Sequence, residues 1–317
     1  MKILLAGTYP DGTADKFRAM LPGHEIAAAE TQEQYDTVED CEIIVVRVLK
    51  TPEKTLDNKK QLKAVIRWGA GYDSVDIEAA GKRGILVANT PGVNSYAVAE
   101  LALGLMISVN RCLDANARQC RGGVWDRNTY SKRSATLNHK TVGIIGGGNI
   151  GRRVAKLVQA LGAEVVYYDV FRLSEEMERS FAMRYVTLDE LLESSDIVSL
   201  HVPLLDSTRH IIGKDQIARM KKTAVVVNTA RGGLIDDGAL AEALSAGKLA
   251  GAGLDCVENE DLANNPLKDF DNVVITPHVG GTSNDLAEEM VPAISEVVKK
   301  FCATGELEHT VNKEFLA

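Results

Sequence analysis

Short, unbroken runs of apolar residues recur along the chain, and they constrain its fold more than any other feature. Continuous rather than alternating apolar residues predict strands that are buried on both faces, as in parallel sheets covered by helices. Polar, helix-compatible stretches separate the runs, so each series predicts an α/β unit. The first series covers residues 3–6, 25–28, 42–46, 62–66 and 85–88. The second covers residues 142–145, 164–168, 197–202, 224–227, 251–254 and 273–275.

Two long helical patterns complete this organisation. One extends over residues 95–119 and is rich in alanine and leucine, and the other is amphipathic and extends over residues 284–301. Because the second series is contiguous, the last helix is free to return to the first unit. We therefore expect one domain of residues 1–98 and 284–317, with residues 99–283 inserted as a second domain.

Length and composition exclude several classes of protein. The 317 residues are enough for two cores. The net charge of −8 argues against nucleic acid or an anionic membrane as the main partner. No apolar stretch approaches the roughly 20 residues that span a bilayer, and the first residues fit a buried strand better than a leader peptide. The five cysteines form no CxxC pair, which indicates reduced thiols and a cytoplasmic protein.

A glycine motif follows the first strand of the second series. Gly146, Gly148 and Gly151 match G-x-G-x-x-G, and a helical pattern over residues 152–161 comes next. Such a triplet occurs by chance, but a strand before it and a helix after it are the context of a dinucleotide-binding turn. Glycine permits the tight turn and the close approach of backbone N–H groups to a pyrophosphate, beside the positive end of the helix.

An acidic residue lies where this motif requires one. The next strand ends at Asp169, eighteen residues after Gly151. A carboxylate there accepts hydrogen bonds from the adenosine ribose and repels a 2′-phosphate, which favours NAD over NADP. Arg172, three residues later, could soften that repulsion.

Three polar side chains follow predicted strand ends in the same unit. They are Arg231 in Asn228-Thr229-Ala230-Arg231-Gly232-Gly233, Glu260 in the segment after Leu254, and His278 in Pro277-His278-Val279-Gly280-Gly281. Open α/β sheets bind ligands at the carboxyl ends of their strands, and a guanidinium can hold a carboxylate through two hydrogen bonds. Each residue alone has an ordinary alternative: a surface ion pair, a solvated acid or a structural histidine. No cluster has the spacing of metal ligands.

Together these segments resemble the D-isomer-specific 2-hydroxyacid dehydrogenase family over nearly the whole chain. The resemblance includes Asn89–Ser95 with Ala97-Val98-Ala99-Glu100, the glycine motif, His201-Val202-Pro203-Leu204, residues 228–235 and residues 277–281. It implies an NAD-binding Rossmann domain inserted into a flavodoxin-like substrate domain. It also implies an NAD-dependent enzyme that transfers a hydride to or from C2 of a small D-2-hydroxy acid.

The resemblance assigns roles to individual residues. His278 matches the acid/base, Glu260 the carboxylate that hydrogen-bonds its imidazole, and Arg231 the substrate clamp. The loop Gly69-Ala70-Gly71 matches the loop whose N–H groups hold the substrate carboxylate, and His278 and Arg231 also contact substrate. The implied cofactor contacts are Gly146, Gly148, Asn149, Ile150, Gly151, Asp169, Val202, Pro203, Thr208, Thr229, Ala230, Arg231, Asp255, His278, Gly280 and Gly281.

The sequence departs from the family pattern at the acid. The family has Glu-Pro, whereas Glu260 is followed by Asp261, and Glu258 lies two residues upstream. Glu260 is preferred because it lies five residues after Asp255, the family's usual spacing.

The identity of the substrate is left open by the sequence. Arg47 resembles the arginine that contacts the phosphate in 3-phosphoglycerate dehydrogenases, which favours 3-phosphoglycerate over glyoxylate or hydroxypyruvate by a small margin. A solvated arginine at a strand end is an equally good interpretation of Arg47. Some relatives are NAD-sensing proteins without turnover, although the complete Arg, Glu and His set favours an enzyme. Residues 121–139 resemble the arm through which relatives form homodimers.

Overall fold

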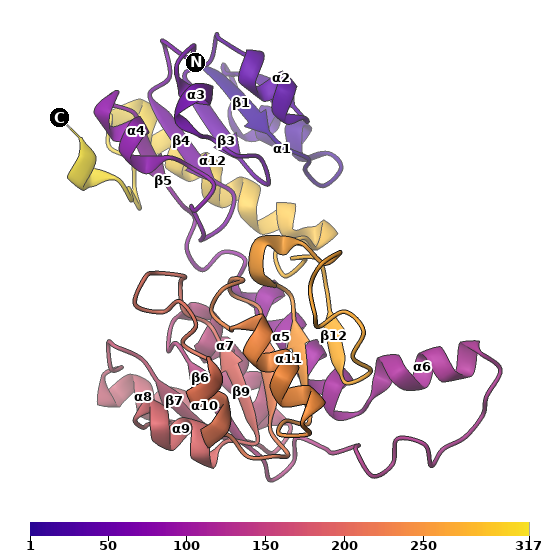
Figure 1. Cartoon of the computed structure of the whole chain (residues 1–317). Coiled ribbons are helices and arrows are strands. Elements are labelled where there is room, and N and C mark those ends of the chain that lie inside the picture. The colour runs from indigo at the N-terminus through magenta and orange to yellow at the C-terminus, as the bar shows by residue number, and fades with distance from the viewer. Residues whose placement is uncertain (317) are drawn as a thin grey trace. The chain divides into compact units, whose positions relative to one another are not determined.

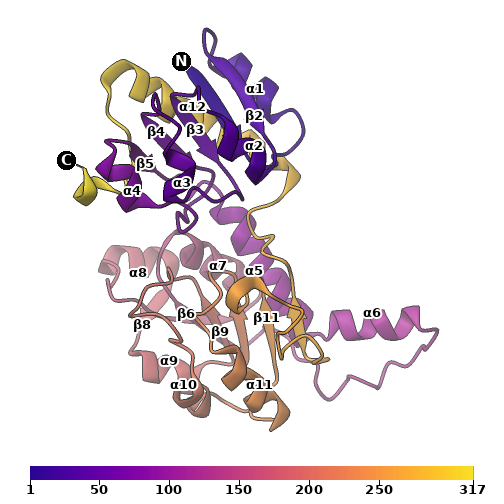
Figure 2. The ribbon, with the colours of Figure 1, turned by 45° about the horizontal axis from the view of Figure 1, so that its top comes forward.

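The computed structural model describes residues 1–316, which fold as two compact units. Unit 1 contains Met1–Asn94 and the residues from Gly281 onward, and unit 2 is Ser95–Gly280. The chain thus crosses between the units after Asn94 and again after Gly280, close to the expected positions of 98 and 284. Figures 1 and 2 show the elements of each unit.

Unit 1 is built on a five-stranded parallel sheet in the order β2-β1-β3-β4-β5. This is the flavodoxin-like order. The first residues form a buried strand, as predicted. The strands are β1 (Lys2–Ala6), β2 (Glu25–Ala29), β3 (Ile43–Val46), β4 (Ala64–Arg67) and β5 (Leu86–Ala88), and the helices are α1 (Thr13–Met20), α2 (Gln32–Thr37), α3 (Glu53–Leu56), α4 (Ile77–Lys82) and α12 (Ala287–Thr304).

The C-terminal part of unit 1 returns to this sheet. Helix α12 packs beside α1. Beyond it, the buried Asn312 side chain accepts a hydrogen bond from the N–H of Val87 and donates one to the carbonyl of Ile85. Strand β5 lies at the edge of the sheet, so one side of it has no neighbouring strand. The Asn312 side chain satisfies backbone groups on or beside this strand that would otherwise lack a partner.

Unit 2 is built on a seven-stranded parallel sheet in the order β12-β11-β10-β9-β6-β7-β8. Numbered within the unit, this is the Rossmann order 3-2-1-4-5-6 with one further strand. The strands are β6 (Thr141–Ile145), β7 (Glu164–Tyr168), β8 (Met183–Tyr185), β9 (Ile197–Leu200), β10 (Val225–Asn228), β11 (Gly251–Leu254) and β12 (Val273–Ile275). The helices are α5 (Ser95–Asn110), α6 (Leu113–Arg121), α7 (Asn149–Ala160), α8 (Glu175–Phe181), α9 (Leu188–Ser194), α10 (Lys214–Arg219) and α11 (Asp237–Ser245).

Helix α5 packs on this sheet unusually closely. A Cβ atom at Gly251 would lie 2.7 Å from Val109 Cγ1, and one at Gly253 would lie 2.9 Å from Leu105 Cβ. The two glycines of β11 therefore provide the space in which α5 buries its apolar face. The all-round apolar character of α5 follows from its contacts with both this sheet and α7.

The structure corrects several details of the predicted elements. The long helix predicted over residues 95–119 is two helices, α5 and α6, bent by 64°. The break falls at Cys112, whose φ of 50° lies in the left-handed region and cannot continue a helix. Strand β8 was not predicted because Arg184 at its centre interrupts the apolar residues. The final helix starts at Ala287 rather than 284, after a 3₁₀ turn (Asn284–Leu286).

Thr187 caps the start of α9 without completing a capping box. The hydroxyl of Thr187 accepts a hydrogen bond from the N–H of Glu190, but the Glu190 carboxylate pairs with Arg184 instead of returning to the cap. No helix within residues 1–316 is by itself long and apolar enough to cross a bilayer, and only the bent pair of α5 and α6 has the combined length and composition.

Candidate active site

The glycine motif forms the turn between β6 and α7. Gly146 has φ 106°, and a Cβ atom there would lie 2.6 Å from the carbonyl oxygen of His201. A Cβ atom at Gly151 would lie 2.1 Å from the carbonyl oxygen of Gly146, so only glycine lets the helix start this close to the strand. At Gly148 no atom lies within 4 Å of an added Cβ. The backbone there borders open space, as a cradle for a pyrophosphate requires.

Asp169 lies directly beside this turn. Its Oδ2 accepts a hydrogen bond from the N–H of Gly147 at 2.7 Å, and its Oδ1 accepts one from the N–H of Phe171 at 3.0 Å. Each carboxylate oxygen has two lone pairs, so each retains an acceptor position for a ribose hydroxyl. Arg172 does not reach towards Asp169, because its guanidinium is paired with Glu178.

Buried polar atoms without partners lie near the point where the strand order reverses, between β6 and β9. The hydroxyl of Thr229 and Nδ1 of His201 are buried, and neither has a hydrogen-bond partner in the described residues. The nearby loop after His201 is closed by Thr208, whose hydroxyl donates to the carbonyl oxygen of Pro203 at 2.7 Å. Ligands of doubly wound sheets bind at this switch point. These residues therefore fit a bound dinucleotide.

Arg231, Glu260 and His278 follow three neighbouring strands, β10, β11 and β12. Since these strands are parallel, their carboxyl ends lie at the same edge of the sheet. The predicted polar residues of unit 2 thus share one edge of the sheet with the glycine turn and Asp169.

His278 and Glu260 form a hydrogen-bonded pair. The Nδ1 atom of the imidazole lies 2.6 Å from Oε1 of Glu260. The pair is open to solvent, with 42% of the histidine side chain and 64% of the glutamate side chain exposed. Because Nδ1 faces the carboxylate, Nε2 is the atom available for proton exchange.

Asp255 fixes the loop that carries His278. Its buried carboxylate accepts hydrogen bonds from the hydroxyl of Thr276 and from the N–H groups of Val279 and Gly280, at 2.6, 2.8 and 2.8 Å. The carbonyl of Asp255 accepts a hydrogen bond from the N–H of His278. These four bonds determine where the imidazole lies.

The turn that carries Arg231 is held by the buried Asn228. Its side chain accepts from the N–H of Ala230 and donates to the carbonyl oxygen of Arg231. A Cβ atom at Gly232 would lie 1.9 Å from the carbonyl oxygen of Val257, so this glycine lets the turn approach the segment after β11. The Arg231 guanidinium donates to the carbonyl oxygen of Ala230 at 2.7 Å.

The loop Val257–Leu267, which carries Glu260, is anchored by a residue that the sequence analysis missed. The buried Asp237 at the start of α11 accepts a hydrogen bond from the N–H of Glu258 at 3.0 Å and one from the Asn265 side chain at 2.6 Å. One carboxylate thereby holds both ends of the loop. Two consecutive aspartates at a helix start indicate a cap, and Asp236 is that cap. Nothing local in the sequence indicates that Asp237 points inward.

The two glutamates of this loop, Glu258 and Glu260, have different partners. The Glu258 carboxylate lies 2.7 Å from Nε2 of His210, so it is committed to a different histidine from Glu260. Asp261, which replaces the proline of the family pattern, accepts hydrogen bonds from the N–H of Ala263 and the Asn264 side chain. These bonds lower the pKa of Asp261 and constrain the chain after Glu260.

The loop Gly69–Gly71 in unit 1 is held by its carbonyl groups. They accept hydrogen bonds from the N–H of Thr90, the Asn89 side chain and Nε of Arg67. Gly69 has φ 127°, a conformation that favours glycine. The N–H of Gly69 also bonds within the protein, because it donates to the Thr90 hydroxyl at 2.8 Å. Within the described residues, the N–H groups of Ala70 and Gly71 are the ones left for an anion.

Arg47 follows β3 in the same unit. Its guanidinium donates to the carbonyl oxygen of Thr8 at 2.5 Å. Partial burial lowers the pKa of Arg47 below its ordinary value.

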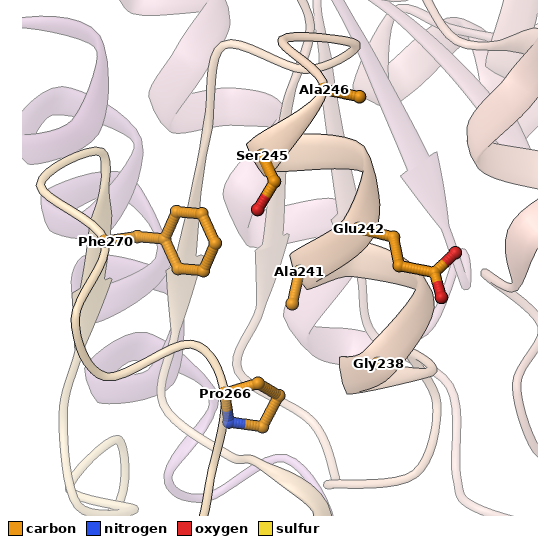
Figure 3. Close-up of a pocket in the computed structure, with 7 residues that line it drawn as sticks. All are labelled: Gly238, Ala241, Glu242, Ser245, Ala246, Pro266 and Phe270. Atoms are coloured by element: carbon orange, nitrogen blue, oxygen red, sulfur yellow. The ribbon is translucent and has the colours of Figure 1, made fainter.

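One hollow on unit 2 is not lined by any of these residues. It has a volume of about 710 Å³ and lies between α11 and the segment from Pro266 to Phe270. In Figure 3 the Phe270 ring faces Ala241, while the Glu242 carboxylate points away from it. No polar groups converge there in the way that a catalytic site requires.

Comparison with known proteins identifies the family. The NAD-binding domain model of the D-isomer specific 2-hydroxyacid dehydrogenases matches residues 103–280. The chain is 39% identical over 291 residues to the D-3-phosphoglycerate dehydrogenase of Methanocaldococcus jannaschii, covering 91% of this chain and 55% of that protein. It thus spans just over half the length of that relative. It is 37% identical over 288 residues to the glyoxylate reductase of Thermococcus litoralis, covering 89% of this chain and 86% of that protein.

A solved structure shows the same fold. The D-lactate dehydrogenase of Aquifex aeolicus, complexed with NAD and lactic acid, has a TM-score of 0.82 and 29% sequence identity, covering 98% of this chain and 99% of that one. The predicted family, fold class and cofactor are therefore confirmed. The chain belongs to the D-isomer specific 2-hydroxyacid dehydrogenases, which are NAD-dependent oxidoreductases.

Proposed function

We propose that this protein transfers a hydride between NAD(H) and C2 of a small D-2-hydroxy acid or the corresponding 2-oxo acid. The observation that carries the proposal is the pair of His278 and Glu260, 2.6 Å apart, at the sheet edge that also bears Arg231. Bound NAD supplies the hydride chemistry through its nicotinamide ring. The protein supplies proton transfer, charge and position.

His278 is the proposed acid/base. In reduction, Nε2–H gives a proton to the oxygen at C2, and in oxidation Nε2 accepts that proton from the hydroxyl. Glu260 accepts the hydrogen bond of Nδ1–H, which keeps the proton-exchanging position on Nε2 and stabilises the imidazolium. This role suits a carboxylate whose Oε1 atom faces Nδ1 of the imidazole.

Arg231 is the proposed clamp on the substrate. Its guanidinium presents several donors in one plane, and such a group can bind a carboxylate and the oxygen at C2 together. It also stabilises negative charge that develops on that oxygen. The turn fixed by Asn228 limits where the guanidinium can lie, and this restriction supports a positioning role.

The glycine turn and Asp169 are the proposed contacts for the pyrophosphate and the adenosine ribose. Asn149 and Ile150 begin helix α7, whose N-terminus faces the same turn. Val202, Pro203, Thr208, Thr229, Ala230, Asp255, Gly280 and Gly281 are the further proposed contacts. The unpartnered hydroxyl of Thr229 supports this set most directly, because a buried donor without a partner is costly.

Within the substrate class we favour 3-phosphoglycerate. Arg47 supports this choice because a second cation, beyond the carboxylate-binding loop Gly69–Gly71, suits a substrate with two anionic groups. Glyoxylate and hydroxypyruvate are the alternatives, and each is the substrate named for a relative. Neither carries a phosphate, so Arg47 would have no anionic partner with them.

A substrate panel tests these proposals together. NADH oxidation is followed at its absorbance band with 3-phosphohydroxypyruvate, hydroxypyruvate, glyoxylate and pyruvate. We expect the highest kcat/KM with 3-phosphohydroxypyruvate, and Arg47→Gln should lower that value while leaving glyoxylate reduction unchanged. A highest kcat/KM with an unphosphorylated acid would refute the substrate assignment alone. Tight NADH binding without turnover on any acid would indicate an NAD-sensing protein instead.

We also propose that the protein is a cytoplasmic homodimer. The five cysteines are unpaired, which suits a reducing compartment. Helix α6 and the segment that follows it extend away from the rest of unit 2 (Figures 1 and 2). Trp125 on this arm is 89% exposed and Val124 is 51% exposed, and such apolar exposure favours a protein partner.

A further inference from the structure

Asp169 directly follows strand β7, and Arg172 lies three residues further along the chain. The Arg172 side chain is bound by neighbouring residues of the protein. Its Nε and NH2 atoms donate to the two carboxylate oxygens of Glu178 at 2.8 and 3.0 Å. Its guanidinium also lies over the ring of Tyr185, 5.1 Å from the centroid. Both its charge and its flat face are therefore engaged within the protein.

Glu178 is in turn held by a second residue, Tyr167. It accepts a hydrogen bond from the hydroxyl of Tyr167 at 2.7 Å, and its side chain is only 14% exposed, against 58% for Arg172. Arg172 and Tyr167 together lower the pKa of Glu178 to about 2, so the carboxylate is charged throughout the functional pH range. The negative partner of Arg172 is thus permanent.

The same network touches the dinucleotide turn. A Cβ atom at Gly147 would lie 3.3 Å from the Tyr167 ring, and the N–H of Gly147 donates to Asp169. The hydroxyl of Tyr167 accepts a hydrogen bond from the N–H of Leu173, next to Arg172. One aromatic side chain therefore connects the glycine turn with the ion pair.

In Rossmann domains an acidic residue at this position binds the ribose hydroxyls of NAD, whereas an arginine nearby accommodates the 2′-phosphate of NADP. This chain has both residue types within four positions. We propose that Glu178 is a specificity-determining residue, which withholds Arg172 from a 2′-phosphate and so excludes NADP together with Asp169. The inference rests on the proposed function of the glycine turn as the cofactor site.

Equilibrium binding of NADH and of NADPH, measured by calorimetry without substrate, tests this role. Glu178→Gln keeps the size of the side chain but removes the charge that holds Arg172. Since ion pairs near the surface contribute little, we expect NADPH to bind only about two- to fivefold more tightly, while NADH affinity stays within about twofold.

Two further variants separate this role from alternatives. Glu175→Gln removes the same charge from the same helix but breaks the exposed pair with Arg179 and no hydrogen bond of Arg172, so it should change the ratio of the two affinities much less. Adding Arg172→Gln to Glu178→Gln should abolish the gain for NADPH. If Glu178→Gln folds poorly, as judged by circular dichroism, Glu178→Asp shortens the carboxylate and should give a smaller gain.

An unchanged affinity ratio in Glu178→Gln would overturn the inference. An equal gain in NADPH affinity in Glu175→Gln would overturn it too, as would a gain that persists when Arg172 is also replaced. A parallel loss of NADH and NADPH affinity in Glu178→Gln would indicate that Glu178 has a merely structural role, and would also overturn the inference. Failure of the unaltered protein to bind NADH would instead contradict the proposed function, so the two failures are distinguishable.

Discussion

His278 has φ 53°, a left-handed conformation that large side chains rarely adopt. Such a conformation costs about 1–3 kcal/mol, and it persists only where the surroundings enforce it. Here the N–H of His278 donates to the carbonyls of Asp255 and Thr276, which hold the residue in this state. The position tolerates asparagine better than most residues, because asparagine adopts left-handed conformations readily.

His278→Asn should therefore keep the backbone and lose the chemistry. We expect turnover to fall by about 10²–10⁴-fold, since asparagine can hydrogen-bond a substrate oxygen but cannot transfer its proton. NADH affinity should be retained, as measured by calorimetry. His309→Asn is the matched control, because His309 has φ 55° and lies outside the candidate site. Near-normal turnover of His278→Asn would refute the proposed mechanism.

Glu260→Gln should act on the pH profile rather than abolish turnover. Without its anionic partner the imidazolium is less stable, so the pH at which the rate of reduction falls by half should move lower. Glu258→Gln breaks the pair with His210 and should leave the profile in place. A shift with Glu258→Gln alone would mean that the acid is misassigned, although the family is not in doubt.

At the scale of elements, the loop Val257–Leu267 depends on helix α11. Its two ends bind one buried carboxylate, that of Asp237, which is 5% exposed. Surface loops are usually mobile, but this anchor limits the positions available to Glu260. The geometry of the His278–Glu260 pair is thereby coupled to the start of a helix that contributes no proposed catalytic group.

Asp237→Asn should disturb both stability and rate. Replacing a charged acceptor by an amide leaves buried donors poorly satisfied, which should lower the free energy of unfolding by about 1–3 kcal/mol. We expect kcat to fall while NADH affinity is retained. Asp215→Asn is the control, because Asp215 lies in the first turn of α10 but is exposed. Urea unfolding and steady-state kinetics measure the two effects, and an unaltered kcat would exclude the positioning role.

His201, just after β9, should make the protein sensitive to acid. Burial lowers the pKa of His201 to about 3, from an ordinary value of 6.5. Between these values the unfolded chain binds the proton and the folded chain does not, so stability falls as the pH drops below 6.5. His201→Gln should lose less stability than the unaltered protein between pH 7 and about pH 4 in urea unfolding. His139→Gln is the control, because His139 is exposed, and this variant should lose as much stability as the unaltered protein. If the free energy of unfolding falls equally with pH in all three proteins, this account is wrong.

At the scale of the whole molecule, the chain makes two separate parallel sheets and passes between their units twice. The arm formed by α6 and residues 122–136 contributes no strand to either sheet. Its exposed apolar residues, Trp125 above all, are costly in a monomer that leaves them in water.

Trp125→Asp should shift the protein from dimer to monomer. A charge buried without a partner in an interface is strongly unfavourable. Sedimentation velocity at micromolar concentration measures the change. Leu161→Asp is the control, because Leu161 is 43% exposed at the end of α7 and lies outside the arm. A Trp125→Asp protein that sediments like the unaltered one would refute the arm as the interface.

Much of the fold followed from local patterns. Buried parallel strands require continuous apolar runs, and the runs at residues 164–168, 251–254 and 273–275 coincide with β7, β11 and β12. Helix ends were harder, because a single left-handed residue, Cys112, ends α5 without any glycine or proline to indicate it. Strand β8 has no continuous apolar run, because Arg184 stands at its centre.

The sequence by itself determined the family, the cofactor and the candidate residues, because glycine at close approaches and polar residues after buried strands are local requirements. Only the tertiary structure decided which partners those residues have. Glu258 and Glu260 are two positions apart, yet one faces His210 and the other His278. Arg172 stands near Asp169 in sequence but is held by Glu178, and Asp237 reaches two ends of a distant loop. Such pairings depend on how strands and helices pack, since contacts between side chains far apart in sequence exist only once the sheet has formed.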